Sequence, residues 1–284
     1  MTLNDWDILE IRDYYSSQNN PSSSIWVFNQ VKSLIDAGYN PLVISPTPIN
    51  PLKPLLKKRF KLYDIPSKQI ENYNGTKVIR PAYLKIPKNK CKSITLKSLS
   101  KCIKKHGNYK NLKIIHSHFG QNGYAALKLK AKLNIPLLTS FYGYDSGRLA
   151  NVFSKYYKQL IEQGEKFLVL SEDMKSDLLQ LGFPEEKIII HHLGVNIEQF
   201  SPIMQKNNKQ FTLITVARLF KAKGIQFVLA ALNDFFKKHP NEKDKIVYKI
   251  IGGGNFETEL KRLTSEYKLE DNVVFINNLI QSQS

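Results

Sequence analysis

The turn "ARLFKAKG" carries two cations at a spacing that suits phosphate chemistry. Arg218 follows an apolar segment with the pattern of a buried strand, and Lys223 comes just before a segment of helical period. The amino terminus of a helix attracts anions, because its N–H groups and partial positive charge point toward them. Two fixed cations at this position therefore suit a diphosphate. Taken alone, an Arg/Lys pair is more often part of a solvated loop.

Three glycines in "IIGGGNFETEL" separate a second apolar strand segment from a helical one. Gly253 and Gly254 would let backbone N–H groups approach a phosphate or a ribose closely. The segment does not match the G-x-G-x-x-G pattern. A plain tight turn that uses glycine for positive φ is an equal alternative.

Polar residues also follow two predicted strands of the amino-terminal half. In "IIHSHFGQNG" we expect His116 and His118 on opposite sides of a strand end, so that only one faces a cleft at the carboxyl edge of the sheet. His118 is nearer that edge, although an isolated histidine there is more often structural. In "TSFYGYDSG", Asp145 suits either ligand hydroxyls or the N-cap of a helix.

The hydrophobic pattern predicts the strands that position these motifs. Short runs rich in Ile and Val alternate with stretches of helical period, which is typical of βαβ units around a parallel sheet. Strands of a first sheet are predicted over residues 6–11, 40–45, 111–118, 135–141, 166–171 and 187–193, with a helix over 24–38 that ends at Gly38. After a linker near 197–210, strands over 211–217, 245–252 and 272–277 alternate with helices over 225–239 and 256–267.

The predicted fold class is therefore α/β with two Rossmann-like domains, residues 1–200 and 201–284. The second domain is expected to be incomplete, because three strands are fewer than the roughly five or six of an ordinary sheet. We expect it to have an open edge and an uncovered apolar face. The residues expected on that face are Val247, Ile250, Ile251, Val274, Phe275 and Ile276.

The composition is that of a soluble globular protein. Apolar residues make up 42% of the 284 residues and charged residues 23%, which excludes a disordered or fibrous chain. No run approaches about 18 apolar residues and the amino terminus is acidic, so we expect a cytoplasmic chain. Cys91 and Cys102 stand without a second pair or a histidine cluster, which argues against disulfides and structural zinc.

The net charge of +18 is confined to one stretch. Residues 51–130 contain 20 Lys and Arg residues against two acids, which predicts one basic face and a polyanionic or anionic-surface partner. Lys97, Lys101, Lys104 and Lys105 surround apolar residues at helical spacing. A solvated helix is one interpretation, and docking to an anionic membrane is the other. Nucleic acid is not expected, because no nucleic-acid-binding motif accompanies the charge.

Five segments together carry a resemblance to a known family. "IIHSHFG", "TSFYGYD", "LGVNIEQFSP", "TVARLFKAKG" and "YKIIGGGNFETEL" resemble retaining glycosyltransferases of GT-B type, in the large glycosyltransferase family 4 or glycosyl transferases group 1. The resemblance implies two Rossmann domains, the first binding the acceptor and the second a nucleotide-diphosphate sugar. It implies a hexosyltransferase that acts with retention on a glycan or lipid-linked acceptor, in cell-surface polysaccharide or glycolipid biosynthesis, without a metal or other cofactor.

The resemblance also assigns roles to residues. Arg218 and Lys223 would hold the donor phosphates and stabilise the leaving diphosphate, which makes them the predicted catalytic residues. Gly253 and Gly254 would complete the donor side. The predicted acceptor-side residues are His118, Gly120, Tyr142 and Asp145, and the predicted membrane-facing residues are Lys97, Lys101, Lys104 and Lys105.

Three departures set this chain apart from the family pattern. Tyr142 stands at the histidine of the family's H-G-x-D motif, and tyrosine supplies no imidazole chemistry. Serines 22–24 replace glycines of the first loop and are expected to cap the following helix. The family's glutamate motif is missing, so we expect a chain truncated at its carboxyl end, with little or no sugar transfer.

A different class of function stays open beside the enzyme. The chain would then be a non-catalytic remnant that serves as an anionic-surface or glycan-binding module. In either case the expected location is the cytoplasm, with peripheral attachment at the inner face of the plasma membrane.

Overall fold

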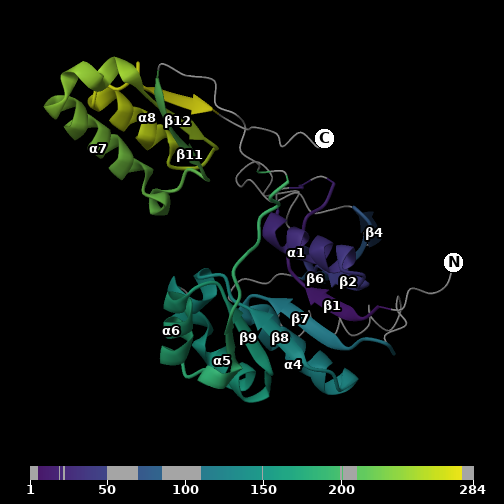
Figure 1. Ribbon diagram of the computed structural model, residues 1–284. Coiled ribbons are helices and arrows are strands. Elements are labelled where there is room, and N and C mark those ends of the chain that lie inside the picture. The colour runs from purple at the N-terminus through teal and green to yellow at the C-terminus, as the bar shows by residue number, and fades with distance from the viewer. Residues whose placement is uncertain are drawn as a thin grey trace. The chain divides into compact units, whose positions relative to one another are not determined.

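The computed structural model describes residues 6–18, 20–21, 23–49, 70–84, 110–148, 150–198, 200 and 210–276. The chain divides into two compact units, Met1–Asn196 and Ile197–Ser284, which are termed unit 1 and unit 2. Each unit is built around its own sheet of mainly parallel strands, with helices between them (Figure 1). The predicted α/β fold class is confirmed.

Unit 1 contains an eight-stranded sheet in the order β10-β9-β8-β7-β1-β2-β5-β4. Its strands are β1 (Ile8–Ile11), β2 (Pro41–Ile44), β4 (Ile70–Tyr73), β5 (Thr76–Ile79), β7 (Ile114–His118), β8 (Leu137–Ser140), β9 (Lys166–Val169) and β10 (Ile188–Ile190). All neighbouring pairs are parallel except β4 and β5. A separate parallel pair consists of β3 (Thr47–Ile49) and β6 (Ala82–Leu84). All six strands predicted for the first sheet are present.

The β4–β5 hairpin is absent from the sequence prediction, although its signal is in the chain. Asn74 and Gly75 connect the two strands with φ angles of 46° and 82°. An Asn-Gly pair between two strands indicates a two-residue turn, because both residues tolerate positive φ. A search for strands separated by helices overlooks such a hairpin, since no helix lies between its strands.

Apolar side chains on both faces of the unit 1 sheet are covered by helices. Helix α1 (Ile25–Asp36) forms one core with Val43 and Val78. Helices α4 (Gly120–Leu133), α5 (Ala150–Gln163) and α6 (Glu172–Gln180) contribute to a larger core that contains Leu42 and Ile44. Leu42 and Ile44 thus point away from Val43, because side chains alternate along a strand.

The two ends of α1 test the sequence prediction separately. Gly38 ends the helix as predicted, with φ 87° and an N–H that donates to Ile35 O (2.9 Å). At the other end, Ser24 is the N-cap residue but makes no side-chain capping hydrogen bond. Its hydroxyl donates to Tyr14 O (3.0 Å) instead. The predicted cap is therefore wrong for Ser24, because its hydroxyl fastens the loop that precedes the helix, and Ser22 lies outside the described residues.

Unit 2 contains a three-stranded parallel sheet. It consists of β11 (Phe211–Val216), β12 (Ile246–Ile251) and β13 (Val273–Ile276), in that order. Helices α7 (Ile225–Lys238) and α8 (Glu257–Glu266) contact each other and share one core with Leu213, Tyr248 and Ile250. Both helices therefore lie on the same face of this sheet, and all five predicted elements are present.

The opposite face of the unit 2 sheet has little cover within the described part of the chain. Ile214 and Val216 of β11 are 60% and 72% exposed, and Val274 of β13 is 43% exposed. Of the residues expected on the uncovered face, Ile250 and Ile251 are buried, and Phe275 packs against the core beneath the helices. That part of the prediction is wrong, because β12 lies between two neighbouring strands and Ile250 points into the core beneath the helices.

Candidate active site

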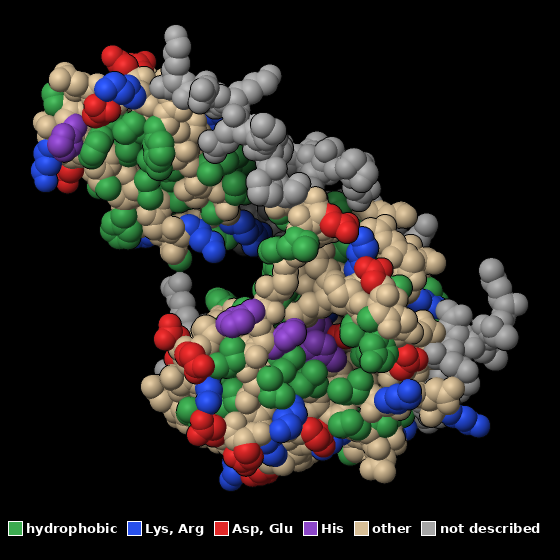
Figure 2. Space-filling view, viewed as in Figure 1, with side chains coloured by type: hydrophobic (Ala, Val, Ile, Leu, Met, Phe, Trp, Pro, Cys, Tyr) green, Lys and Arg blue, Asp and Glu red, His purple; other side chains and the backbone are tan. Residues whose placement is uncertain are grey.

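Four polar side chains of unit 1 converge because of the strand register. The pairing of β1 with β7 sets Glu10 beside His116, and the pairing of β7 with β8 sets His118 beside Ser140. Side chains two positions apart on a strand point the same way, and the rings of His116 and His118 are 4.3 Å apart between centroids. The expectation that these histidines lie on opposite sides is therefore wrong. Figure 2 shows histidine side chains gathered on one face of unit 1.

Glu10 accepts hydrogen bonds from both histidines. His118 Nε2 lies 2.8 Å from Glu10 Oε2, and His116 Nδ1 lies 3.2 Å from Glu10 Oε1. An ionised carboxylate offers only acceptors, so each of these ring nitrogens carries a proton. The other nitrogen of each ring faces a hydroxyl: Tyr142 Oη is 2.6 Å from His118 Nδ1, and Ser140 Oγ is 2.8 Å from His116 Nε2.

Electrostatics and burial fix the charges of Glu10 and His118 at neutral pH. Burial alone would raise the pKa of Glu10, but the adjacent His116 and His118 outweigh it and lower the pKa to about 2. His118 is fully buried, and this burial, together with the neighbouring His116, lowers its pKa to about 4 in spite of Glu10. The pair therefore consists of a carboxylate and a neutral imidazole.

Tyr142 is less buried than Glu10 and His118. Its ring contacts those of Phe119 and Trp26, with centroid distances of 5.0 Å and 6.2 Å. Burial raises the pKa of the Tyr142 phenol, so its hydroxyl keeps its proton. The side chain thus presents a protonated hydroxyl flanked by aromatic rings.

Asp145 and Gly120 fasten the turn that carries Tyr142. Asp145 is 1% exposed, and its two oxygens accept the N–H groups of Gly120 (2.7 Å) and Tyr142 (3.0 Å). Burial raises the pKa of Asp145, against the lowering effect of these donors. A Cβ on Gly120 would lie 2.7 Å from ring atoms of Phe141 and Tyr157. Asp145 is therefore buried and used by backbone donors, and the Cβ direction of Gly120 is filled by aromatic rings, so both residues shape the site from within the unit.

Arg12 at the end of β1 adds a cation to this region. Its Nε donates to Ser24 Oγ (3.0 Å), and it forms an ion pair with Asp13. Its guanidinium carbon lies 4.4 Å from the centre of the Phe119 ring. Asn122 also donates to Asp13 Oδ1 (2.9 Å). Arg12 therefore ties the end of β1 to the starts of α1 and α4.

A second cation, Arg80, secures the loop between β1 and α1 from inside the unit. Arg80 is 3% exposed, and it donates to Ser16 O (2.6 Å), Tyr15 O (3.2 Å) and Glu71 Oε2 (3.1 Å). Glu71 also accepts the N–H of Gln18 (3.2 Å). The β4–β5 hairpin thus holds the loop in place, because Glu71 lies on β4 and Arg80 directly follows β5.

In unit 2, the two predicted cations lie on one short loop. Arg218 follows β11, Lys223 ends the 3-10 turn η3 (Lys221–Lys223), and both are exposed. Gly224, with φ 73°, ends this turn and precedes α7. The first turn of α7 has no acidic residue and no side-chain cap. The positive end of its dipole is therefore uncompensated beside Lys223.

The glycine loop after β12 interlocks with the loop that carries Arg218. Leu219 N–H donates to Gly253 O (3.0 Å), and Phe256 N–H donates to Leu219 O (2.9 Å). A Cβ on Gly254 would collide with the backbone oxygen of Leu219, whereas nothing lies within 4 Å of a Cβ on Gly253. The structure thus brings the predicted donor-side residues together at one edge of the sheet.

Glu10, His116 and His118 also form a group that could hold a metal ion. Their possible ligand atoms lie within 4.8 Å of one another. In this structure these atoms are hydrogen-bonded to each other. The expectation of a site without metal stays a prediction.

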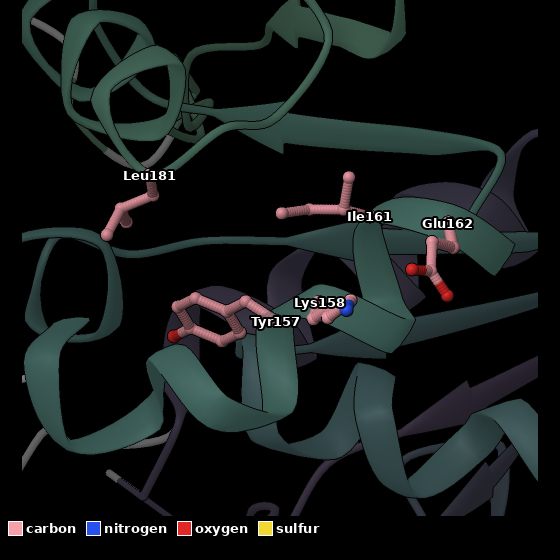
Figure 3. Close-up of a pocket in the computed structure, with 5 residues that line it drawn as sticks. All are labelled: Tyr157, Lys158, Ile161, Glu162 and Leu181. Carbon is pink, nitrogen blue, oxygen red and sulfur yellow. The ribbon is translucent and has the colours of Figure 1, made fainter.

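A separate pocket of about 260 Å³ lies beside α5. It is lined by Tyr157, Lys158, Ile161, Glu162 and Leu181 (Figure 3). None of the strand-end residues described above lines it. We therefore assign it no part in the site.

The predicted membrane-facing residues, Lys97, Lys101, Lys104 and Lys105, lie outside the described residues. None of the helices in the described ranges combines the length and apolar character needed to cross a bilayer. Binding to a membrane surface stays a prediction.

Glu10, Arg12 and Arg80 are candidates that the sequence interpretation missed. Glu10 stands in the middle of a strand whose four residues are all buried. A charged side chain in such a strand requires partners, because an unpaired buried charge is costly. That conflict between charge and pattern is the signal from which Glu10 could have been found.

Comparison with family models assigns both halves of the chain. Residues 24–199 match the model described as Glycosyltransferase Family 4, and residues 196–283 match Glycosyl transferases group 1. The first match covers more than half of the chain.

Two curated relatives are similar over part of their length. The protein provisionally named colanic acid biosynthesis glycosyltransferase WcaL, of Escherichia coli (strain K12), is 31% identical over 160 residues, which are 55% of this chain and 38% of the relative. The amylovoran biosynthesis glycosyltransferase AmsK of Erwinia amylovora is 29% identical over 164 residues, 56% of this chain and 39% of the relative. The matched region thus spans less than half the length of either relative.

Solved structures show the same fold over nearly the whole chain. Sucrose-phosphate synthase from Thermosynechococcus elongatus has a TM-score of 0.64 at 17% identity, over 96% of this chain and 71% of that one. Anabaena HepE in complex with UDP has a TM-score of 0.63 at 13% identity, over 95% and 69%. These similarities confirm the expected GT-B fold.

Proposed function

Because the chain belongs to Glycosyltransferase Family 4, we propose that it transfers a sugar from a nucleotide-diphosphate sugar to a glycan or lipid-linked acceptor. The observation that carries this proposal is the loop of unit 2 with the exposed Arg218 and Lys223 beside the uncompensated end of α7. Similarity to HepE, which was solved with UDP, supports a uridine nucleotide. The names of WcaL and AmsK support cell-surface polysaccharide biosynthesis as the setting.

In the proposed reaction, negative charge develops on the diphosphate as it leaves the sugar. The Arg218 guanidinium offers two parallel N–H donors and Lys223 offers a compact charge. Together with the end of α7, they stabilise that charge without a proton transfer. The acceptor hydroxyl attacks the anomeric carbon from the face that the diphosphate leaves, and a departing phosphate oxygen takes its proton. The configuration is thereby retained, and neither a side-chain base nor a metal is needed.

The donor half of the proposal is tested by titrating the full chain with UDP in a calorimeter. Arg218→Ala or Lys223→Ala is expected to weaken UDP binding about 10- to 100-fold, because each removes a charge-assisted hydrogen bond. The matched control is Lys237→Ala, which removes the same charge from the other end of α7 and is expected to bind UDP as the wild type does.

Two outcomes would change this assignment. If the Arg218→Ala, Lys223→Ala double variant binds UDP as tightly as the wild type, the pair is only surface charge. If the wild type binds UDP but transfers no sugar to any glycan or lipid-linked acceptor offered, the proposal of a transferase is abandoned in favour of the non-catalytic binding module.

The membrane part of the proposal rests on the +18 charge confined to residues 51–130. Binding to anionic liposomes is expected to weaken with salt, because exposed charges are screened over about 8 Å at physiological ionic strength. Replacing Lys97, Lys101, Lys104 and Lys105 by Glu should weaken it further. Equal retention on neutral and anionic vesicles would contradict this.

A further inference from the structure

We propose that Glu10 and His118 are positioning residues that commit the hydroxyl proton of Tyr142 to His118, so that Tyr142 Oη meets a bound sugar only as a hydrogen-bond acceptor. The ligand class is a sugar with a hydroxyl that donates to Tyr142. The choice of a sugar rests on the proposed function. The proton arrangement rests on the geometry of unit 1 alone.

The Glu10 carboxylate sets the direction of the hydrogen bonds that link Glu10, His118 and Tyr142. Glu10 can only accept, so the proton of the 2.8 Å contact sits on His118 Nε2. A neutral imidazole carries one N–H, so His118 Nδ1 has a lone pair. Tyr142 Oη, 2.6 Å away, must then donate to it. Tyrosine has one hydroxyl proton, and this contact uses it.

The surroundings of the three groups maintain this arrangement. Glu10 and His118 are 1% and 0% exposed, so solvent does not compete for their hydrogen bonds. Burial disfavours the charged forms of both side chains, so the fully buried His118 imidazole stays neutral and the Tyr142 phenol keeps its proton. Gln30 Oε1 lies 3.4 Å from Tyr142 Oη. Gln30 does not take the proton, because the His118 contact is much shorter.

Tyr142 is only partly buried, unlike Glu10 and His118, and this gives the arrangement its consequence. Its hydroxyl has lone pairs left for a ligand, and its ring is flanked by Phe119 and Trp26. Flat aromatic surfaces beside an oriented polar atom suit a sugar, whose ring has apolar C–H faces and hydroxyls at its rim. A hydroxyl of that sugar can donate to Tyr142 Oη, whereas a group that only accepts finds no donor there.

A metal ion is the competing explanation of the same cluster. Glu10, His116 and His118 converge within 4.8 Å, and a metal bound there would replace both N–H protons that now point at Glu10. His118 would then carry its proton on Nδ1 and donate to Tyr142 Oη. The two explanations therefore predict opposite tautomers of His118.

The first experiment reads the tautomer directly. Long-range proton–nitrogen NMR spectra of the nitrogen-15-labelled full chain at neutral pH should show His118 with its proton on Nε2, before and after addition of one equivalent of Zn²⁺. In Glu10→Gln this preference should be lost, because an amide both donates and accepts. A proton on Nδ1, a doubly protonated ring, or stoichiometric Zn²⁺ binding that Glu10→Gln abolishes would overturn the proposal. If Glu10→Gln does not fold, the wild-type spectrum decides alone.

The second experiment tests the ligand. Binding of methyl glucoside, methyl galactoside and their single deoxy and deoxyfluoro analogues is measured by saturation-transfer NMR on wild type, Tyr142→Phe and the control Tyr144→Phe. Tyr144 is the exposed neighbour at 58%. In wild type and in Tyr144→Phe, removing the sugar hydroxyl that donates to Tyr142 should weaken binding about 3- to 10-fold. The deoxyfluoro sugar at the same position should bind no better, because fluorine cannot donate a hydrogen bond. In Tyr142→Phe this discrimination should vanish.

The remaining outcomes are also decisive. If the wild type binds no member of the set more tightly than Tyr142→Phe does, or if the deoxyfluoro sugars bind as well as the parents, the proposal is overturned. UDP titration of Tyr142→Phe separates this result from the proposed function. If the wild type does not bind UDP, the proposed donor site of unit 2 is contradicted. The tautomer of His118 does not depend on that result, because it is measured without UDP.

Discussion

Unit 1 and unit 2 place their charged groups in opposite ways. In unit 1, Glu10, Arg80 and Asp145 are 1%, 3% and 1% exposed, and all are hydrogen-bonded inside the unit. In unit 2, Arg218 and Lys223 are exposed on a loop. A buried charge is costly when its partner is removed, whereas an exposed cation contributes little to folding. Replacing one of the buried charged groups of unit 1 should therefore change stability and site together, and replacing Arg218 or Lys223 in unit 2 should change ligand binding alone.

The largest effect should come from comparing a buried arginine with an exposed one. Arg80→Met is expected to destabilise unit 1 by about 3 to 5 kcal/mol, because Glu71 would be left as an uncompensated buried charge. Arg262 makes two ion pairs on α8 but is 58% exposed, so Arg262→Met should leave the unfolding midpoint of unit 2 essentially unchanged.

Chemical denaturation separates these two results. Trp6 and Trp26 are the two tryptophans of the chain, and both belong to unit 1, so their fluorescence follows that unit. Hydrogen exchange resolved to the amides of unit 2 follows that unit. Equal losses of unfolding free energy in the two variants would contradict this prediction, since the burial of Arg80 would then have no energetic consequence.

The next effect concerns acid. The pKa of His118 is lowered from 6.5 to about 4 in the folded chain, so between about pH 6.5 and pH 4 the unfolded chain binds a proton that the folded chain does not. The stability of unit 1 should be complete above this window and fall by about 3 kcal/mol as the pH decreases through it. Glu10, with its pKa lowered from 4.5 to about 2, should add a further loss below about pH 4.5.

The acid effect is checked by tryptophan-monitored unfolding at several pH values. His118→Asn should have a lower stability at neutral pH but a flatter pH dependence through the upper window. If the slope of the wild type persists in His118→Asn, the acid sensitivity belongs to other groups.

The sequence could predict most elements of both units but not the cluster around Glu10. Strands and helices follow from local patterns, and Arg218 and Gly253 could be expected together because parallel strands end at a common edge. The contact of Glu10 with His118 depends on the register of strands far apart in the chain, which no local pattern contains. The exposed face of β11 depends on α7 and α8 packing on the same side of the sheet. Periodicity alone does not specify that side.

A smaller effect should distinguish the two glycines predicted on the donor side. Gly254→Ala is expected to destabilise unit 2 by about 1 to 3 kcal/mol, because its Cβ would collide with Leu219 O. It should also weaken UDP binding, since the loop of Arg218 would have to move. Gly253→Ala, with open space around its Cβ, should change neither. Thermal unfolding by circular dichroism and UDP titration check both variants, and equal behaviour would contradict the interlocked loops.

The smallest effect should come from replacing the same side chain on two sheets. Val43 of β2 is 0% exposed and Val216 of β11 is 72% exposed. Val43→Thr is expected to cost about 1 to 2 kcal/mol, because its hydroxyl would enter an apolar core. Val216→Thr should cost close to nothing, because its hydroxyl would remain in water. Denaturant unfolding of both variants makes the comparison, with tryptophan fluorescence for unit 1 and hydrogen exchange for unit 2. If Val216→Thr costs as much as Val43→Thr, the β11 face is buried in solution by something outside the described residues. Chromatography of the wild type across a range of concentrations would then show whether that cover is a second copy of the chain.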